Sequence, residues 1–182
     1  MCGRLRGRQI LSDYVSLSQR TLSKVFGKVR SPFFKRDSDN KMLDITVVCV
    51  GNLKDKFFVD ACAEYSKRLA AFCKLKVIEL KDGAPIIPHL PPKARKVALC
   101  VEGKQMSSEE LASYIEAVPN AGISELCFVI GAFDGLTEEV KAKCDLRLSF
   151  SKMTFPHRLM RVILLEQIYR AFTIINGGKY HK

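Results

Sequence analysis

The sequence predicts an α/β fold: a mainly parallel sheet with helices on both faces. From residue 44 onward, short segments rich in β-branched residues alternate with helical patterns, the order typical of strand–helix–strand units. The strand segments VVCV, VALCV and LCFVI are apolar throughout rather than at every second residue, as expected for strands covered on both faces.

The first half of this region contains two strands and one helix. They are DITVVCVG (44–51), DKFFVDACAEYSKRLAAF (55–72) and KLKVIEL (74–80). The helix is amphipathic, with Phe58, Cys62, Tyr65 and Leu69 on one side. A proline-rich link, GAPIIPHLPP, follows the second strand.

The second half continues the alternation. Its elements are a strand at 96–102, a helix at 107–118, a strand at 125–131, a short helix from about Thr137, a strand at 146–150 and a long helix at about 156–175. Ser107 and Glu110 form a capping box for the first of these helices. The last helix is apolar nearly all round, which predicts burial on more than one side. One side covers the sheet, and we expect the other to meet a second copy in a two-fold homodimer.

The net charge of +11 is concentrated at the front of the chain. Residues 1–41 contain ten Lys and Arg against three Asp, which leaves +4 for the remainder. We expect residues 1–41 to be a basic, disordered extension and residues 42–182 to form the domain. Three interpretations of the extension stay open: a translated upstream region or cloning remnant, a flexible RNA-binding arm, and an organellar transit peptide.

The seven cysteines are scattered singly and form no CxxC pair. Free thiols in a reducing compartment are the simplest interpretation, so we expect a cytoplasmic protein with no metal. No run approaches the ~20 apolar residues that cross a bilayer, and we expect no membrane partner.

Three loops follow strand ends: VEGKQ (101–105), GAFDG (131–135) and FSKMTF (150–155). Ligands of open α/β sheets bind at the carboxyl ends of strands, so these loops are the candidate pocket. None matches a phosphate-binding loop. Taken alone, GAFDG is typical of a glycine turn, and a mononucleotide-like ligand remains possible.

GAFDG, followed by LSFSKMTFPHRLMRVILLEQIYRAF and ending in GKYHK, resembles the ribosomal RNA large subunit methyltransferase H family. This family is the small, single-domain branch of the SPOUT superfamily of S-adenosylmethionine-dependent methyltransferases. The resemblance covers most of residues 42–182, including VGNLKDKF and LCVEGKQMSSEELA.

The resemblance implies a C-terminal trefoil knot that holds the methyl donor, S-adenosyl-L-methionine. By position, the donor site would comprise Leu99, Gly131, Phe150, Ser151, Lys152, Met153, Thr154 and Phe155. The implied substrate is N3 of a pseudouridine in 23S rRNA of the ribosome. The candidates for catalysis are His181, Tyr180, Arg161 and His157, and we expect the tail to fold over the pocket.

Two departures from the family pattern leave alternatives open. The link between the second and third strands lacks the usual helix, and Ala132 replaces the second glycine of the usual turn. The chain is therefore predicted to be a 23S rRNA methyltransferase, with two alternatives: a SPOUT methyltransferase with another RNA target, or an inactive ribosome-binding relative.

Overall fold

The computed structural model describes residues 42–181, without the side chain of His181; the predicted extension, residues 1–41, lies outside the described part. The elements are β1 (Asp44–Val50), α2 (Lys56–Leu69), β2 (Lys74–Leu80), a 3-10 helix η1 (Ile87–His89), β3 (Arg95–Gln105), α3 (Ser108–Asn120), β4 (Glu125–Ile130), α4 (Glu138–Ala142), β5 (Leu146–Ser149), α5 (His157–Ile175) and a 3-10 helix η2 (Lys179–His181). The predicted alternation of strands and helices is confirmed. The capping box of α3 is also confirmed, because Ser107 and Glu110 exchange both hydrogen bonds.

The five strands form one sheet in the order β2-β1-β4-β3-β5. Every neighbouring pair is parallel, as predicted. All the strand carboxyl ends therefore lie at one edge, where GAFDG and FSKMTF begin. The strand order does not by itself specify a trefoil knot, which stays a prediction from the resemblance.

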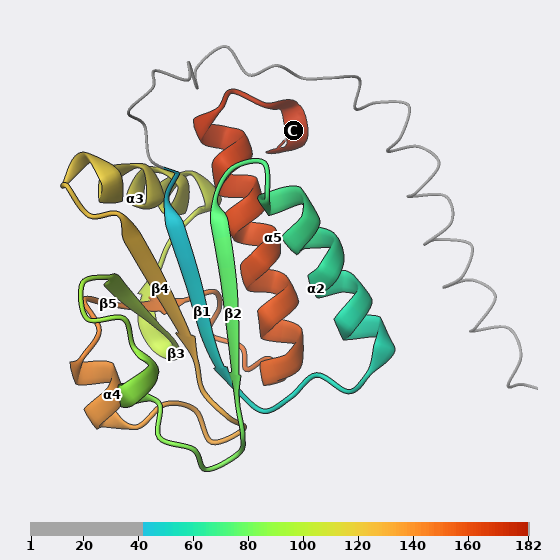
Figure 1. Cartoon of the computed structure of the whole chain (residues 1–182), viewed down its shortest axis with the longest axis vertical. Helices are drawn as coiled ribbons and strands as arrows, with labels where there is room; N and C mark the ends of the chain where they lie inside the picture. The colour runs from blue at the N-terminus through green and yellow to red at the C-terminus, as the bar shows by residue number, and fades with distance from the viewer. Residues whose placement is uncertain (1–41, 182) are drawn as a thin grey trace, which may run out of the picture. The chain divides into compact units, whose positions relative to one another are not determined.

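Helices cover the two faces unequally. Figure 1 shows α2 and α5 side by side on one face of the sheet and the short α4 on the other. The larger core cluster joins α2, α3 and α5 to inward-facing strand residues such as Val47 and Phe128. The smaller one joins α4 to the opposite face through Val48 and Val129. These two clusters explain why β1 and β4 are apolar at successive positions.

The link between β2 and β3 substitutes for a helix on the second face. Ile86, Ile87 and Leu90 are half-buried and pack against the smaller cluster. The single turn of η1 is the only helical structure that the described link contains. The departure noted in the sequence therefore leaves this face covered, but by a thin layer of side chains.

The third strand is interrupted where it borders β5. Leu99 pairs with Leu148, and Lys104 pairs with the same residue after a register shift. Residues 100–103 consequently bulge away from the ladder. Gly103 allows the bulge, because a Cβ atom there would lie 2.7 Å from the backbone carbon of Leu148. This bulge places Cys100 and Glu102 beside the carboxyl ends of β4 and β5.

None of the helices within residues 42–181 has the length and apolar character needed to span a membrane.

Candidate active site

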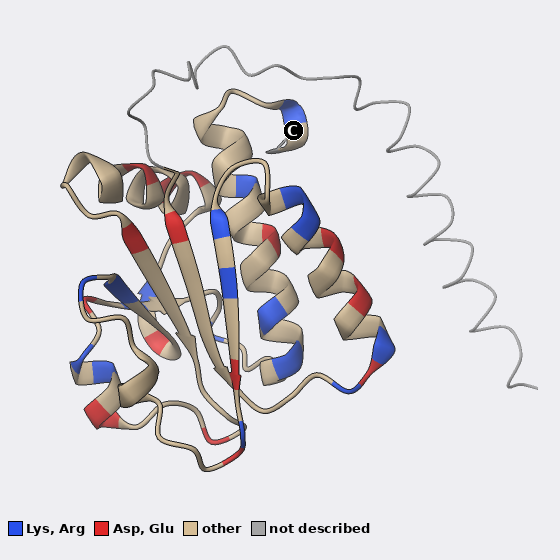
Figure 2. Ribbon diagram, viewed as in Figure 1, with Lys and Arg blue, Asp and Glu red and all other residues tan. Residues whose placement is uncertain are grey.

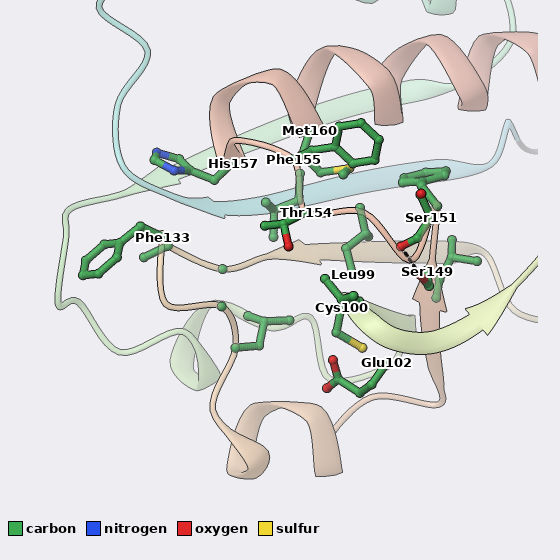
Figure 3. Close-up of a pocket in the computed structure, with 18 of the residues that line it drawn as sticks. Leu99, Cys100, Glu102, Phe133, Ser149, Ser151, Thr154, Phe155, His157 and Met160 are labelled. Carbon is green, nitrogen blue, oxygen red and sulfur yellow. Dashed lines mark hydrogen bonds between the residues drawn. The ribbon is translucent and has the colours of Figure 1, made fainter.

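Two of the candidate loops, GAFDG and FSKMTF, meet around one cavity of about 290 Å³ at the carboxyl edge of the sheet (Figure 3). The prediction that VEGKQ (101–105) is a loop was wrong, because this segment is the bulged end of β3, held by its pairing with β5. Its residues Val101 and Glu102 line the same cavity. The lining of the cavity includes seven of the eight predicted donor-site residues: Leu99, Gly131, Phe150, Ser151, Met153, Thr154 and Phe155. Lys152, the eighth, is exposed and does not line the cavity. Parallel strand ends bring the loops together, since residues 99, 130 and 148 lie on three adjacent strands.

The GAFDG segment is a tight turn that closes on itself. Gly135 has a φ of +86°, and its N–H donates to the carbonyl of Ala132 over 3.1 Å. A Cβ atom on Gly131 would lie 2.1 Å from the carbonyl oxygen of Gly135, so only glycine fits at position 131. Ala132 has no positive φ. Its replacement of the usual glycine therefore leaves the turn unstrained.

The FSKMTF loop is held by local hydrogen bonds rather than by strand pairing. The Ser149 hydroxyl donates to the carbonyl of Ser151 over 2.9 Å, and the N–H of Met153 donates to Oγ of Ser151 over 3.0 Å. Pro156 is the N-cap of α5, with extended ψ of 133°, and the helix begins at His157. Pro156 was expected at the first helical position, and the difference is one residue at a helix end. The loop thus presents backbone and side chains to the cavity in a fixed shape.

Charged groups lie on the wall formed by β3 and α4. Lys141 donates to Glu102 and, over 3.0 Å, to Glu138. The hydrogen bond from Lys141 lowers the pKa of Glu102, and the hydrogen bond to Glu102 raises the pKa of Lys141. The first turn of α4 is acidic, with Glu138 and Glu139, and its last turn contains Lys141; Figure 2 colours these charges. The sequence did not indicate the Lys141–Glu102 contact, because 39 residues separate the partners.

Cys100 also lines this wall. Burial, followed by the charge of Glu102, raises the pKa of its thiol, so the sulfur stays protonated at neutral pH. No cluster of three or more His, Cys, Asp or Glu side chains that could hold a metal ion occurs among residues 42–181.

His157 lies on the lining of the cavity. Its Nε2 atom lies beside Gly51 at the end of β1, since a Cβ built on that glycine would be 3.4 Å from it. Burial, and then the charges of Arg161 and Arg158, lower the pKa of His157 below its ordinary value of 6.5. The imidazole is therefore neutral at pH 7 and able to accept a proton.

Arg161 does not line the cavity, and its side chain is 2% exposed. Its guanidinium donates to Glu79 over 2.6 Å, to the carbonyl of Val50 over 2.8 Å and to the carbonyl of Gly51. Its Nε atom is buried without a protein partner. These contacts connect α5 to the ends of β1 and β2. A catalytic role for Arg161 stays a prediction.

The C-terminal tail lies at the opposite end of α5 from the cavity, as Figure 1 shows. The Tyr180 hydroxyl donates to Glu166 over 3.3 Å, and Arg170 lies 4.9 Å from the centre of the Tyr180 ring. Glu166 and Arg170 are six and ten residues beyond Met160 of the cavity, roughly 9–15 Å along the helix.

The expectation that the tail folds over the pocket is thus wrong within a single chain. The physical reason is that Tyr180 finds an aromatic site locally: its ring lies 4.9 Å from that of Tyr169. Burial, and a hydrogen bond with Tyr65, raise the pKa of Tyr180 far above its ordinary value. Tyr180 is therefore a neutral hydrogen-bond donor and not a base. The side chain of His181 lies outside the described residues.

Comparisons with known proteins agree with this architecture. A family model described as "Predicted SPOUT methyltransferase" matches residues 43–181. Ribosomal RNA large subunit methyltransferase H of Bacillus pumilus is 42% identical over 159 positions, covering 77% of this chain and 100% of the relative. The proteins of the same name from Clostridium novyi and Clostridioides difficile are 45% and 43% identical, with the same coverage.

The aligned part of this chain is shorter than these relatives. Since 77% of 182 residues is about 140, about 19 of the 159 aligned positions have no residue of this chain opposite them. This difference agrees with the short link between β2 and β3.

Two solved structures have the same fold at low sequence identity. A probable methylase family protein from Haemophilus influenzae superposes with a TM-score of 0.53 at 13% identity, covering 77% of this chain and 71% of the other. A probable methyltransferase from Bordetella pertussis gives 0.52 at 12%, covering 71% and 95%. The family match and the identities above show that this chain belongs to the SPOUT methyltransferases, in the ribosomal RNA large subunit methyltransferase H family.

Proposed function

We propose that this chain transfers a methyl group from S-adenosyl-L-methionine to N3 of a pseudouridine in 23S rRNA of the ribosome. The observation that carries the proposal is the cavity, because FSKMTF and GAFDG, the segments most specific to the family resemblance, meet in it. The names of the relatives support the large-subunit rRNA as substrate. Ribosomes as substrate fit a cytoplasmic enzyme, while the transit-peptide interpretation would direct it to organellar ribosomes.

The lining fits a donor that combines an apolar base with charged groups. Leu99, Phe155 and Met160 offer apolar walls, and the turn at Gly131 brings backbone close to the ligand. The hydrogen bond from Lys141 lowers the pKa of Glu102, and this ion pair supplies the charged part of the lining. When bound, the donor supplies a methyl group activated by a positively charged sulfur.

The thiol of Cys100 lies in the same cavity and must not compete for the methyl group. Only a thiolate is a strong nucleophile. Because burial raises its pKa, Cys100 remains a neutral thiol and does not divert the reaction.

The acceptor nitrogen carries a proton that has to be removed before or during transfer, because a protonated imide nitrogen is a poor nucleophile. Of the three candidates whose side chains are described, only His157 lines the cavity. We propose that its neutral imidazole accepts the proton from the acceptor nitrogen. Arg161 holds the N-terminal part of α5 in place, and so positions His157 one turn earlier on the helix.

The tail takes part only if a second copy supplies it, given its place at the far end of α5. Leu159, Val162 and Ile163 are half-buried apolar residues on this helix, and a two-fold contact through them would run two α5 helices past each other. In such a homodimer the tail of one copy would approach the cavity of the other. Residues of that tail would then lie near the rRNA nucleotide.

The test uses ribosomes from cells that lack the gene. Purified protein and donor should produce N3-methylpseudouridine in 23S rRNA, detected by nucleoside mass spectrometry and located by primer extension. The shortened link favours a second candidate, an inactive or redirected relative. Absence of donor binding by calorimetry would support the inactive relative, and donor binding with methylation of another RNA would support the redirected one.

A further inference from the structure

Phe133 is the most exposed of the large hydrophobic side chains in the described residues, at 92%. Isolated exposed apolar residues are common, but this one has a particular place. Of the six such side chains, three line the candidate active site: Val101, Phe133 and Met153. The mouth of the cavity therefore exposes apolar surface to whatever approaches it.

The backbone under Phe133 is a closed, tightly packed turn. Gly131 and Leu136, which flank the turn, are buried, and Gly131 packs directly against Gly135. The N–H of Gly135 closes the turn on the carbonyl of Ala132. This closed turn places the Cα atom of Phe133 at the tip of the loop, so the ring stands in solvent where a partner can cover it.

The ring does not face the donor. Figure 3 shows the side chain of Phe133 pointing away from the cavity, to the same side as the ring of His157. Phe133 lies at the edge of the cavity, and its ring extends outward from the other lining residues. Whatever covers Phe133 arrives from outside, along with the acceptor.

The negative charge beside the ring favours contact with an RNA base over contact with a phosphate group. Asp134 is the next residue and is exposed. Its carboxylate repels a phosphate at this position. The flat face of a base is uncharged, and unpaired bases of RNA loops stack on aromatic side chains.

We propose that Phe133 is a substrate-binding residue that stacks on the unpaired nucleobase next to the methylated one. This inference rests on the proposed function, since it requires an RNA acceptor. The target base enters the cavity, and its neighbour, still outside, covers the phenyl ring. Stacking positions the strand without reading its sequence, because every base has a flat face.

The test compares Phe133→Ala and Phe133→Trp with the wild type, using ribosomes that lack the methyl group. Base–aromatic stacking predicts that Phe133→Ala raises KM for ribosomes by roughly 5- to 150-fold. For Phe133→Ala we expect kcat and the donor Kd to stay within about twofold of the wild type. The salt dependence of its KM should be unchanged, because no phosphate contact is lost. Phe133→Trp should retain the wild-type KM.

Phe57→Ala is the matched control, because Phe57 is 64% exposed on α2 and does not line the cavity. It should leave KM unchanged. A wild-type KM in Phe133→Ala would overturn the inference, as would a weakened donor Kd, which would show that the ring contacts the donor. If the wild-type protein methylates no rRNA, the proposed function itself fails; an active wild type with an unaffected Phe133→Ala removes only this inference.

Discussion

Replacing Arg161 by methionine should destabilise the protein by about 3 kcal/mol while leaving the chemistry of the cavity intact. The methionine side chain fills much of the space of the arginine stem but cannot donate hydrogen bonds. Arg161→Met therefore leaves the carbonyls of Val50 and Gly51 without this donor and Glu79 without its ion pair.

The magnitude follows from the burial of each partner. Breaking a fully buried ion pair costs about 3–5 kcal/mol. Here the arginine is 2% exposed but Glu79 is 38% exposed, so its carboxylate can be hydrated once the pair is broken. The lower end of the range is therefore expected. For a domain of this size, about 3 kcal/mol lowers the melting temperature by roughly 10 °C.

Urea unfolding measures the effect, provided that the slope of the transition is the same for all variants. Arg158→Met is the matched control on the same helix. Its side chain is 39% exposed and pairs with the exposed Asp55, so the loss should be below about 1 kcal/mol. Donor affinity and turnover are then compared at a temperature where each variant is folded.

The reasoning predicts a destabilised Arg161→Met that still binds the donor. A variant as stable as the wild type but without turnover would refute it, and would restore Arg161 as a residue of the chemistry. Arg161→Lys separates charge from geometry, because lysine keeps the charge but cannot reach three acceptors with a planar fork.

Three further predictions concern the turn, the tail and the histidine. Gly131→Ala should weaken donor binding by roughly tenfold or more, because the new Cβ displaces the carbonyl of Gly135. Ala132→Gly is the control and should bind the donor as the wild type does. Equal donor affinities of Gly131→Ala and the wild type in calorimetry would contradict the prediction. A chain ending at Lys179, without residues 180–182, should bind the donor but not turn over, and mixing it with Gly131→Val should restore some activity through mixed dimers. A sedimenting monomer with full activity would exclude this arrangement. Finally, the lowered pKa of His157 predicts that its titration costs no folding free energy above pH 6.5 and an increasing amount as the pH falls below that value. The free energies of unfolding of wild type and His157→Gln should therefore coincide at pH 8 and diverge in acid. Parallel curves would show that the folded protein does not lower this pKa.

Most of the secondary structure could be predicted because its signals are local. Apolar runs marked β1, β3 and β4, and the capping box marked the start of α3. The strand order could not be read in the same way. A continuous apolar run shows that both faces of a strand are covered, but it does not identify which strands lie beside it.

The site was predicted in outline for a similar reason. Loops after parallel strands share one edge of the sheet, so the meeting of GAFDG and FSKMTF followed from the topology. The ion pair of Arg161 with Glu79 spans 82 residues, and the exposure of Phe133 depends on the packing of the turn around it. Neither has a signature in the local sequence. The position of the tail relative to the cavity was predicted wrongly. Its motif resembles the family's ending, but a motif does not show that α5 carries the tail away from the cavity.

The order of the strands also determines when the sheet can be completed during synthesis. β1 pairs with β2 soon after both are made, but its other edge waits for β4, where Asp44 is matched with Glu125. At about 5–20 residues per second, the roughly 80 intervening residues take about 4–16 s to translate. Throughout this interval the apolar edge of β1 has unpaired N–H and C=O groups that can template association with other chains. The nascent protein should therefore depend on shielding of this edge, by the ribosome or a chaperone, until β4 has emerged.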